Sequence, residues 1–209
     1  MNSPALRLYV DSGFMSPYAM SAFVALHEKG ADVEIATVDL AAEENREPDY
    51  ANLSLTRRVP TLIHGDFSLS ESSAITEYVD EVLPGAPLYP VGARERARAR
   101  QLQAWLRSDL MPLRAERSTE VVFRAPVATA LSPEARRAAD TLFAVADRLI
   151  ASDDADIFGA WSIVDLDLAI MLSRLVRNDD PVPDKLAAWT RRQWARPSAR
   201  RWIDLDRPG

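Results

Sequence analysis

The amino-acid sequence predicts an α/β domain with a mixed four-stranded sheet, followed by an all-helical domain. Strand and helix patterns alternate in residues 1–84, whereas no convincing strand pattern appears in 93–209. Between them, proline and glycine crowd into residues 84–92, a density that favours a linker over the interior of an element. We therefore expect domains at 1–84 and 93–209, joined by a linker at 85–92.

The first domain opens with a strand-helix-strand pattern. Residues 5–10 alternate as a strand does, and Ser16-Pro17 predicts the start of a helix whose apolar spacing continues to Gly30. Residues 33–40 form the next strand, which should run parallel to the first because a helix connects them.

The remainder of the first domain predicts a helix, a hairpin and a second helix. Residues 41–58 are polar and weakly periodic, and we expect one irregular helix there. Residues 59–70 read as two short strands joined at His64-Gly65-Asp66. A helix over 71–83 then ends at the linker.

The second domain contains long helical patterns. We expect helices over residues 93–117, 132–151, 162–176, 184–194 and 197–205. Pro112 should kink the first of these helices. The helix over 162–176 is the most apolar and should be buried.

Composition excludes several classes of site. With no cysteine, the chain cannot form a disulfide, a zinc-thiolate site or a thiol nucleophile, so any reactive sulfur must come with a ligand. Two histidines argue against a metal site, and a net charge of −6 argues against broad nucleic-acid binding. The apolar runs fall far short of the roughly 20 residues of a membrane helix, and we see no secretory signal.

The loop after the first strand contains Ser16, which fits two compatible roles. As an N-cap, its oxygen accepts a backbone N–H, while its own hydroxyl hydrogen remains able to donate. The same position lies at the positive end of a helix dipole, which favours an anion. A ligand thiolate docked at Ser16 would be stabilised by both the hydroxyl and the dipole.

Two further segments fit either a structural or a ligand-binding role. Val59-Pro60 can simply open a strand, or it can be a cis peptide that leaves the Val59 N–H and C=O free to pair with an extended peptide. Glu71 and Ser72 can cap the following helix, or they can bind the ammonium and carboxylate groups of an amino acid.

In combination, these motifs resemble those of the cytosolic glutathione S-transferases. The chain has a Ser-Pro after the first strand, a Val-Pro eleven residues before Glu-Ser, and an all-helical second half. The similarity extends to serine-type members and to a YfcF-like bacterial subgroup, through the stretches SPYAMSAFVAL, RRVP, SESSAI and RARARQLQAWLRSDLMP. It covers nearly the whole chain.

The resemblance implies a thioredoxin-like fold for the first domain and a role for each motif. Ser16 would activate the glutathione thiol, and Val59, in a cis bond with the next residue, would pair with the cysteinyl unit. Glu71 and Ser72 would hold the γ-glutamyl end. Arg58 would reach the glycine carboxylate.

The implied function is glutathione transfer in a cytoplasmic homodimer, with glutathione as co-substrate and no metal. The thiolate would attack a small hydrophobic electrophile, as in detoxification, or a peroxide under oxidative stress. Peroxide reduction needs no protein cysteine, because a second glutathione can resolve the sulfenic product. The alternative is a stress-response protein that binds glutathione but turns over poorly. The presence of all three motifs favours the enzyme, and the absence of the zeta-type Ser-Ser-Cys loop argues against maleylacetoacetate isomerase activity.

Other features fit structural roles at least as well as functional ones. The alternating arginines of residues 94–100 would spread over several directions on a helix, which favours a solvated or dimer-facing surface. Ser162 and Asp165 match the family's capping box. Candidate walls of the electrophile pocket, for which core packing is the alternative, are Phe14, Met15, Trp105, Met111 and Phe123.

Overall fold

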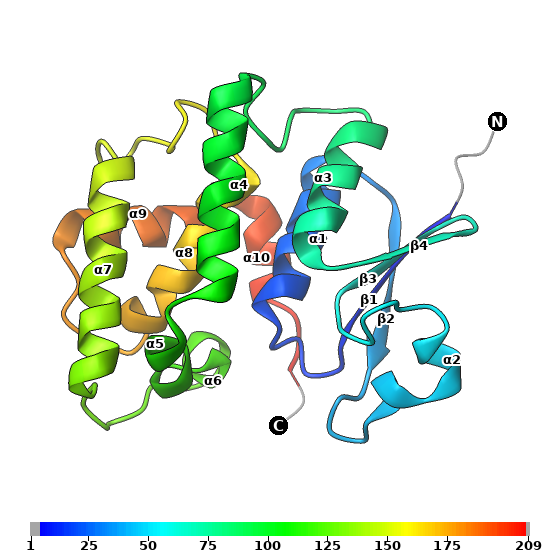
Figure 1. Ribbon diagram of the computed structural model, residues 1–209, viewed down its shortest axis with the longest axis horizontal. Coiled ribbons are helices and arrows are strands. Elements are labelled where there is room, and N and C mark those ends of the chain that lie inside the picture. Colours follow the sequence, from blue (N-terminus) through cyan, green and yellow to red (C-terminus); the bar gives the residue numbers. More distant parts are fainter. Residues whose placement is uncertain (1–4, 208–209) are drawn as a thin grey trace. The chain divides into compact units, whose positions relative to one another are not determined.

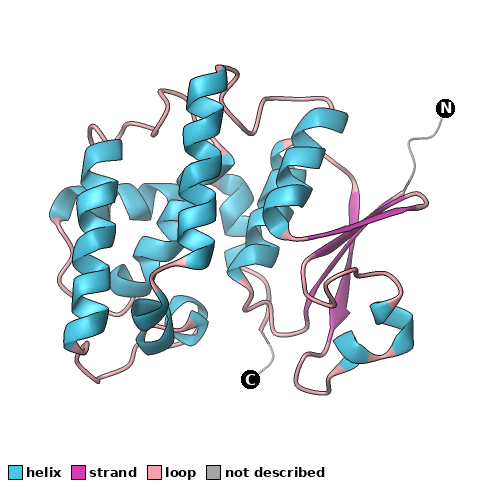
Figure 2. Ribbon diagram, in the orientation of Figure 1, coloured by secondary structure: helices cyan, strands magenta, loops and turns pink. Residues whose placement is uncertain are grey.

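The computed structural model describes residues 5–207, which form two compact units (Figures 1 and 2). The first unit comprises residues 5–88 together with 201–207, and the second comprises 89–200. The division at residue 88 lies inside the predicted linker. The placement of residues 201–207 in the first unit has no counterpart in the sequence prediction.

The first unit contains a mixed sheet with the strand order β2-β1-β3-β4. The central strand β1 (Leu6–Asp11) pairs in parallel with β2 (Val33–Val38) and antiparallel with β3 (Thr61–His64). β4 (Phe67–Ser70) pairs antiparallel with β3 and completes the hairpin. The predicted mixed four-stranded sheet is confirmed.

Helices cover both faces of this sheet. α1 (Pro17–Glu28) and α3 (Ser72–Val82) pack against each other on one face, and α2 (Pro48–Ala51) lies on the other (Figure 1). A short 3-10 helix, η1 (Glu44–Arg46), precedes α2, so the single irregular helix expected over 41–58 is wrong. Pro48 explains the break, because proline disfavours a helical conformation in the residue before it.

The second unit is helical throughout its described length, and the predicted all-helical second domain is confirmed. Its helices are α4 (Ala93–Ser108), α5 (Met111–Glu116), α6 (Thr119–Phe123), α7 (Pro133–Leu149), α8 (Ile163–Val176), α9 (Asp184–Trp194) and the start of α10 (Pro197–Ile203). As predicted from its apolar composition, α8 is buried except at Asp167 and Val176. Among the described helices, none combines the length and apolar character that spanning a bilayer requires.

The expected continuous helix over 93–117 is wrong. The chain leaves α4 at Asp109 and adopts a left-handed conformation at Leu110, with φ 62°, before α5 begins. The Asp109 carboxylate accepts the Leu110 N–H at 2.7 Å, which stabilises this break. Pro112 therefore lies in the first turn of a new helix, where its missing N–H costs nothing, and does not kink an existing one.

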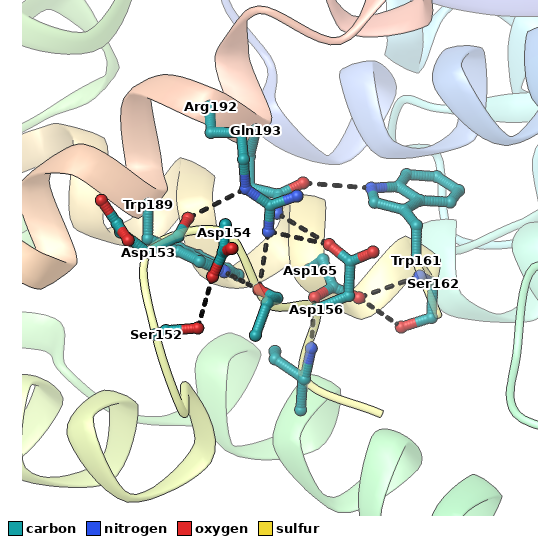
Figure 3. A network of polar contacts seen from close by, with 12 residues as sticks. Ser152, Asp153, Asp154, Asp156, Trp161, Ser162, Asp165, Trp189, Arg192 and Gln193 are labelled. Atoms are coloured by element: carbon teal, nitrogen blue, oxygen red, sulfur yellow. Dashed lines mark hydrogen bonds and ion pairs between the residues drawn. The ribbon is translucent and has the colours of Figure 1, made fainter. Parts of the chain in front are cut away.

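The capping box at the start of α8 is confirmed and belongs to a wider polar network (Figure 3). Asp165 is fully buried, and its carboxylate accepts hydrogen bonds from Ile157 N at 2.9 Å, Ser162 N at 2.9 Å and Ser162 Oγ at 2.7 Å. Beside it, Arg192 pairs with Asp156 at 2.9 Å. The network ties the loop before α8 to α9.

Candidate functional site

Strand register brings the three predicted site segments to one end of the sheet. Thr61, the first residue of β3, pairs with Tyr9 of β1 on one side and with Ser70, the last residue of β4, on the other. The loop after β1, the loop before β3 and the turn after β4 therefore meet at the same edge. Because α1 and α3 follow two of these segments directly, both helix N-termini lie at this edge as well.

Ser16 is the N-cap of α1, as the Ser-Pro sequence predicts. Its backbone is extended, and its Oγ accepts the Ala19 N–H at 3.2 Å. Asp11, at the end of β1, is 7% exposed, and its carboxylate accepts the Met15 N–H at 2.6 Å and the Ser16 N–H at 3.0 Å. Asp11 thus fixes the backbone of the loop that presents Ser16.

The segment before β3 is held by three hydroxyl groups. The bond between Val59 and Pro60 is cis. On the preceding residue, the Arg58 carbonyl oxygen lies 2.8 Å from Tyr50 Oη, 3.2 Å from Ser54 Oγ and 3.0 Å from Thr61 Oγ1. Burial raises the pKa of the Tyr50 hydroxyl, so it stays protonated and able to donate. We call these three hydroxyl-bearing residues the carbonyl clamp. The Arg58 side chain itself is exposed.

Glu71 and Ser72 differ in their surroundings. The side chain of Glu71 is exposed and makes no capping hydrogen bond, whereas Ser72, the first residue of α3, is only 4% exposed. A capping role for the Glu71 side chain is therefore wrong. Its backbone lies at φ 75° and ψ 115°, outside the regions that side-chain-bearing residues usually occupy.

Left-handed backbone occurs at each of the three segments. Phe14 has φ 51° two residues before Ser16, Arg57 has φ 55° two residues before Val59, and Glu71 has φ 75°. Non-glycine residues in such conformations cost about 1–3 kcal/mol each and cluster at ligand sites. Their coincidence at one edge of the sheet marks this edge as the candidate functional site.

The electrostatics of this edge favour an anionic ligand carrying an ammonium group. Two helix N-termini and the exposed guanidinium groups of Arg57 and Arg58 supply positive charge. Exposed Glu71 supplies the carboxylate that an ammonium would need. Within residues 5–207, no group of three or more metal-ligating side chains is found.

Comparison with known proteins decides the family. The glutathione S-transferase N-terminal domain matches residues 5–81, and the glutathione S-transferase C-terminal domain matches residues 92–207. The chain belongs to the glutathione S-transferase family. This confirms the predicted thioredoxin-like domain followed by a helical domain.

Individual relatives place the chain within this family. Glutathione S-transferase 1 of Dianthus caryophyllus is 34% identical over 112 residues, which are 54% of this chain and 51% of the relative. The match thus spans about half the length of that curated transferase. A Burkholderia glutathione transferase homologue, solved with bound glutathione, is 48% identical with a TM-score of 0.79, covering 95% of this chain and 96% of its own.

A solved maleylacetoacetate isomerase from Methylobacterium extorquens, with bound malonate and glutathione, also resembles this glutathione S-transferase family member. It is 27% identical with a TM-score of 0.74, and the match covers 97% of this chain and 98% of the isomerase. The match to this isomerase thus extends over both units of the chain.

The residues that hold the loops of the candidate site in place were not predicted from the sequence. These are Asp11 and the carbonyl clamp, which hydrogen-bond to the loop backbone. Asp11 ends a strand with a polar residue, and Thr61 follows a proline at a buried strand position. A buried polar residue next to a predicted site loop is the signal that could have found them.

The five candidate walls of the electrophile pocket remain predictions. Phe14 and Met15 are half-buried in the first unit, and Phe123 packs against Trp194 in the second, with ring centroids 6.0 Å apart. Met111 is 57% exposed. Trp105 donates its indole N–H to the carboxylate of Asp109 at 3.0 Å.

Proposed function

We propose that the chain is a serine-type glutathione S-transferase of the YfcF-like subgroup, acting in the cytoplasm. Ser16 activates the glutathione thiol for attack on small hydrophobic electrophiles, and the same thiolate reduces peroxides. The observation that carries the proposal is the free donor capacity of the Ser16 hydroxyl.

A second Ser-Pro N-cap in the same chain allows a comparison of the two serine hydroxyls as hydrogen-bond donors. Ser132 caps α7 as Ser16 caps α1, and each Oγ accepts the N–H three residues later at 3.2 Å. The Ser132 hydroxyl, however, donates to the Glu116 carboxylate, and these hydrogen bonds lower the pKa of Glu116. The Ser16 hydroxyl has no acceptor among the described residues, so its hydrogen is available to a ligand.

A thiolate is the acceptor that this position suits. A free thiol has a pKa of about 8.5 and is mostly protonated at neutral pH. Lowering that pKa by ~2 units takes ~2.7 kcal/mol of preferential stabilisation of the thiolate. One charge-assisted hydrogen bond from Ser16 and the dipole of α1 are together of that size.

The other predicted residues hold the rest of glutathione in this proposal. The Val59 backbone pairs with the cysteinyl unit, as a strand does with its neighbour. Glu71 binds the γ-glutamyl ammonium, while Ser72 and the N-terminus of α3 bind the γ-glutamyl carboxylate. Arg58 pairs with the glycine carboxylate. The exposed guanidinium of Arg58 and the exposed carboxylate of Glu71 support the assignment.

The test is glutathione binding measured by calorimetry, together with turnover of an aryl halide and of an organic hydroperoxide. We expect binding at or below millimolar glutathione and measurable turnover of both substrates. Binding without turnover would support the alternative, a glutathione-binding stress-response protein. A protein that binds no glutathione at millimolar concentration would contradict the proposal as a whole.

Replacing Thr61 by valine tests the carbonyl clamp. The valine keeps the volume but removes the hydroxyl that lies 3.0 Å from the Arg58 carbonyl oxygen and 2.9 Å from Ser54 Oγ. We expect a loss of about 1–3 kcal/mol in the free energy of unfolding and several-fold weaker glutathione binding, because the segment that includes Val59 loosens. Thr141→Val, on the exposed face of α7, is the matched control and should change neither quantity.

We also propose that two copies form a homodimer through Leu55. This side chain is 96% exposed, so burying it against a second copy would remove its apolar surface from water. A groove of about 420 Å³ between α4 and α7 is lined by Leu102, Trp105, Val145 and other residues, and would accept it from a second copy.

The dimer is tested by sedimentation. Leu55→Asp and Val145→Asp should each shift the protein towards monomer. Val91→Asp, at another apolar side chain that is 86% exposed, should leave the dimer intact. A monomeric wild type, or a dimer unaffected by both substitutions, would refute this interface.

A further inference from the structure

The C-terminal segment of the first unit packs against the loop that presents Ser16. Trp202 is fully buried there. Its ring meets Phe14 edge-on at 5.7 Å between centroids and an interplanar angle of 87°, and it meets Phe23 at 5.2 Å and 63°. Phe14 belongs to the Ser16 loop and Phe23 to α1, so the Trp202 ring bridges the loop and the helix that the loop begins.

Phe14 is the residue through which this contact can act on Ser16. Its left-handed backbone, with φ 51°, is unfavourable for a bulky side chain and persists only where the surroundings impose it. On the backbone side, its N–H donates to the Asp11 carbonyl at 3.0 Å, and the next two N–H groups bind the Asp11 carboxylate. The Phe14 side chain is constrained by its contact with the Trp202 ring.

The segment that carries Trp202 is itself held by hydrogen bonds. The guanidinium of Arg207 donates to the Trp202 carbonyl at 3.0 Å, the Ile203 carbonyl at 2.8 Å and the Leu205 carbonyl at 3.1 Å, which closes the end of α10. The buried Nε1 of Trp202 has no hydrogen-bond partner among the described residues. Because a buried polar group without a partner costs stability, the tryptophan contributes here through the size and shape of its ring.

From this geometry we propose that Trp202 is a positioning residue for Ser16. It holds Phe14 in its left-handed conformation and thereby aims the Ser16 hydroxyl at the glutathione sulfur. The proposal rests on the proposed function, since it needs a thiol to be activated. It differs from ordinary core packing in one respect: the loss of Trp202 must change the acidity of the bound thiol, and not only the stability of the fold.

The experiment compares Trp202→Ala, Trp202→Phe and wild type. The apparent pKa of the bound thiol is read from the pH dependence of kcat/KM, and glutathione affinity from calorimetry. Trp202→Ala should raise the thiol pKa by about 1 unit, which lowers kcat/KM about 10-fold at pH values below that pKa. Glutathione affinity at low pH should stay within about twofold, because the other two loops are untouched. Trp202→Phe keeps a ring and removes the unpartnered N–H, so it should restore the wild-type thiol pKa.

Two further variants separate positioning from stability. Trp189→Ala removes an equally buried tryptophan from the second unit; it should lower the melting temperature yet leave the thiol pKa unchanged. Phe14→Leu should raise the thiol pKa as Trp202→Ala does, and the double substitution should add nothing further. If Trp202→Ala does not fold, Phe14→Leu and Trp202→Leu provide the same readout.

The outcomes are distinguishable. A wild-type thiol pKa in Trp202→Ala, or in Phe14→Leu where the former does not fold, overturns the positioning role while leaving the transferase proposal intact. A wild-type protein that does not lower the thiol pKa at all overturns both.

Discussion

Replacing Ser16 by alanine is expected to raise the pKa of the thiol of bound glutathione by about 1–2 units. It should also lower kcat/KM with an aryl halide by about 10–100-fold at neutral pH. In the proposed function the hydroxyl donates to the thiolate, and a hydrogen bond to a charged group contributes about 1.5–3 kcal/mol. Glutathione affinity measured at low pH should be unchanged, since the thiol is then protonated in both proteins. Thiolate absorbance as a function of pH, alongside turnover, provides the measurement.

Ser132→Ala is the matched control for this substitution. It also removes a Ser-Pro N-cap, so it should cost about 1 kcal/mol or more of stability, as Ser16→Ala does. Because Ser132 lies in the second unit and donates to Glu116, its loss should leave the thiol pKa and kcat/KM unchanged. Equal turnover of Ser16→Ala and wild type, at equal glutathione affinity, would exclude the hydroxyl as the activator.

Replacing Asp165 by asparagine is expected to lower the free energy of unfolding by about 2–4 kcal/mol. The carboxylate accepts three hydrogen bonds in a fully buried position (Figure 3). An asparagine oxygen can keep the bond from Ile157 N, but the amide nitrogen would face the Ser162 N–H, donor against donor. Chemical denaturation at fixed pH measures the loss.

The same substitution has a predicted pH signature. Burial raises the pKa of the Asp165 carboxyl above its ordinary value, so the folded state binds its proton more tightly than the unfolded state does. The stabilisation from this group is therefore complete below the unfolded pKa of about 3.9 and is lost as the pH rises through the raised folded pKa. The stability advantage of wild type over Asp165→Asn should shrink over that window.

Asp140→Asn, at an exposed position on α7, is the control for Asp165→Asn. It should lie within about 0.5 kcal/mol of wild type at every pH. An Asp165→Asn protein as stable as Asp140→Asn would show that the capping box does not stabilise the fold.

Local signals explain which parts of the fold the sequence predicts well. Ser16-Pro17, Gly30 and the His64-Gly65-Asp66 turn each set a backbone conformation through neighbouring residues, and these boundaries are confirmed to within a few residues. The break at Leu110 was missed because the apolar spacing continues on both sides of it. The left-handed conformation there depends on a side-chain bond from Asp109, which periodicity does not reveal.

The residues of the candidate site also fall into those that local sequence signals predict and those that they do not. Residues that would touch the ligand were recognisable as short motifs, because each motif lies at the start of a helix or a strand. Their supports were not, because the hydrogen bonds of Asp11 and Tyr50 to nearby loops leave no periodic pattern in the sequence, and Trp202 acts across the fold. Trp202 is 188 positions from Phe14 in the chain, a separation over which no single-sequence pattern carries information.

The discontinuity of the first unit has a consequence for biosynthesis. Residues 5–88 leave the ribosome well before 201–207, and the 112 residues of 89–200 lie between them. At about 5–20 residues per second, the sheet waits roughly 6–22 s for the segment that carries Trp202. During that interval Phe14 lacks its aromatic neighbour, so the Ser16 loop is among the last parts of the first unit to reach its final surroundings. A nascent chain therefore completes the surroundings of the Ser16 loop only after residues 89–200 have been synthesised.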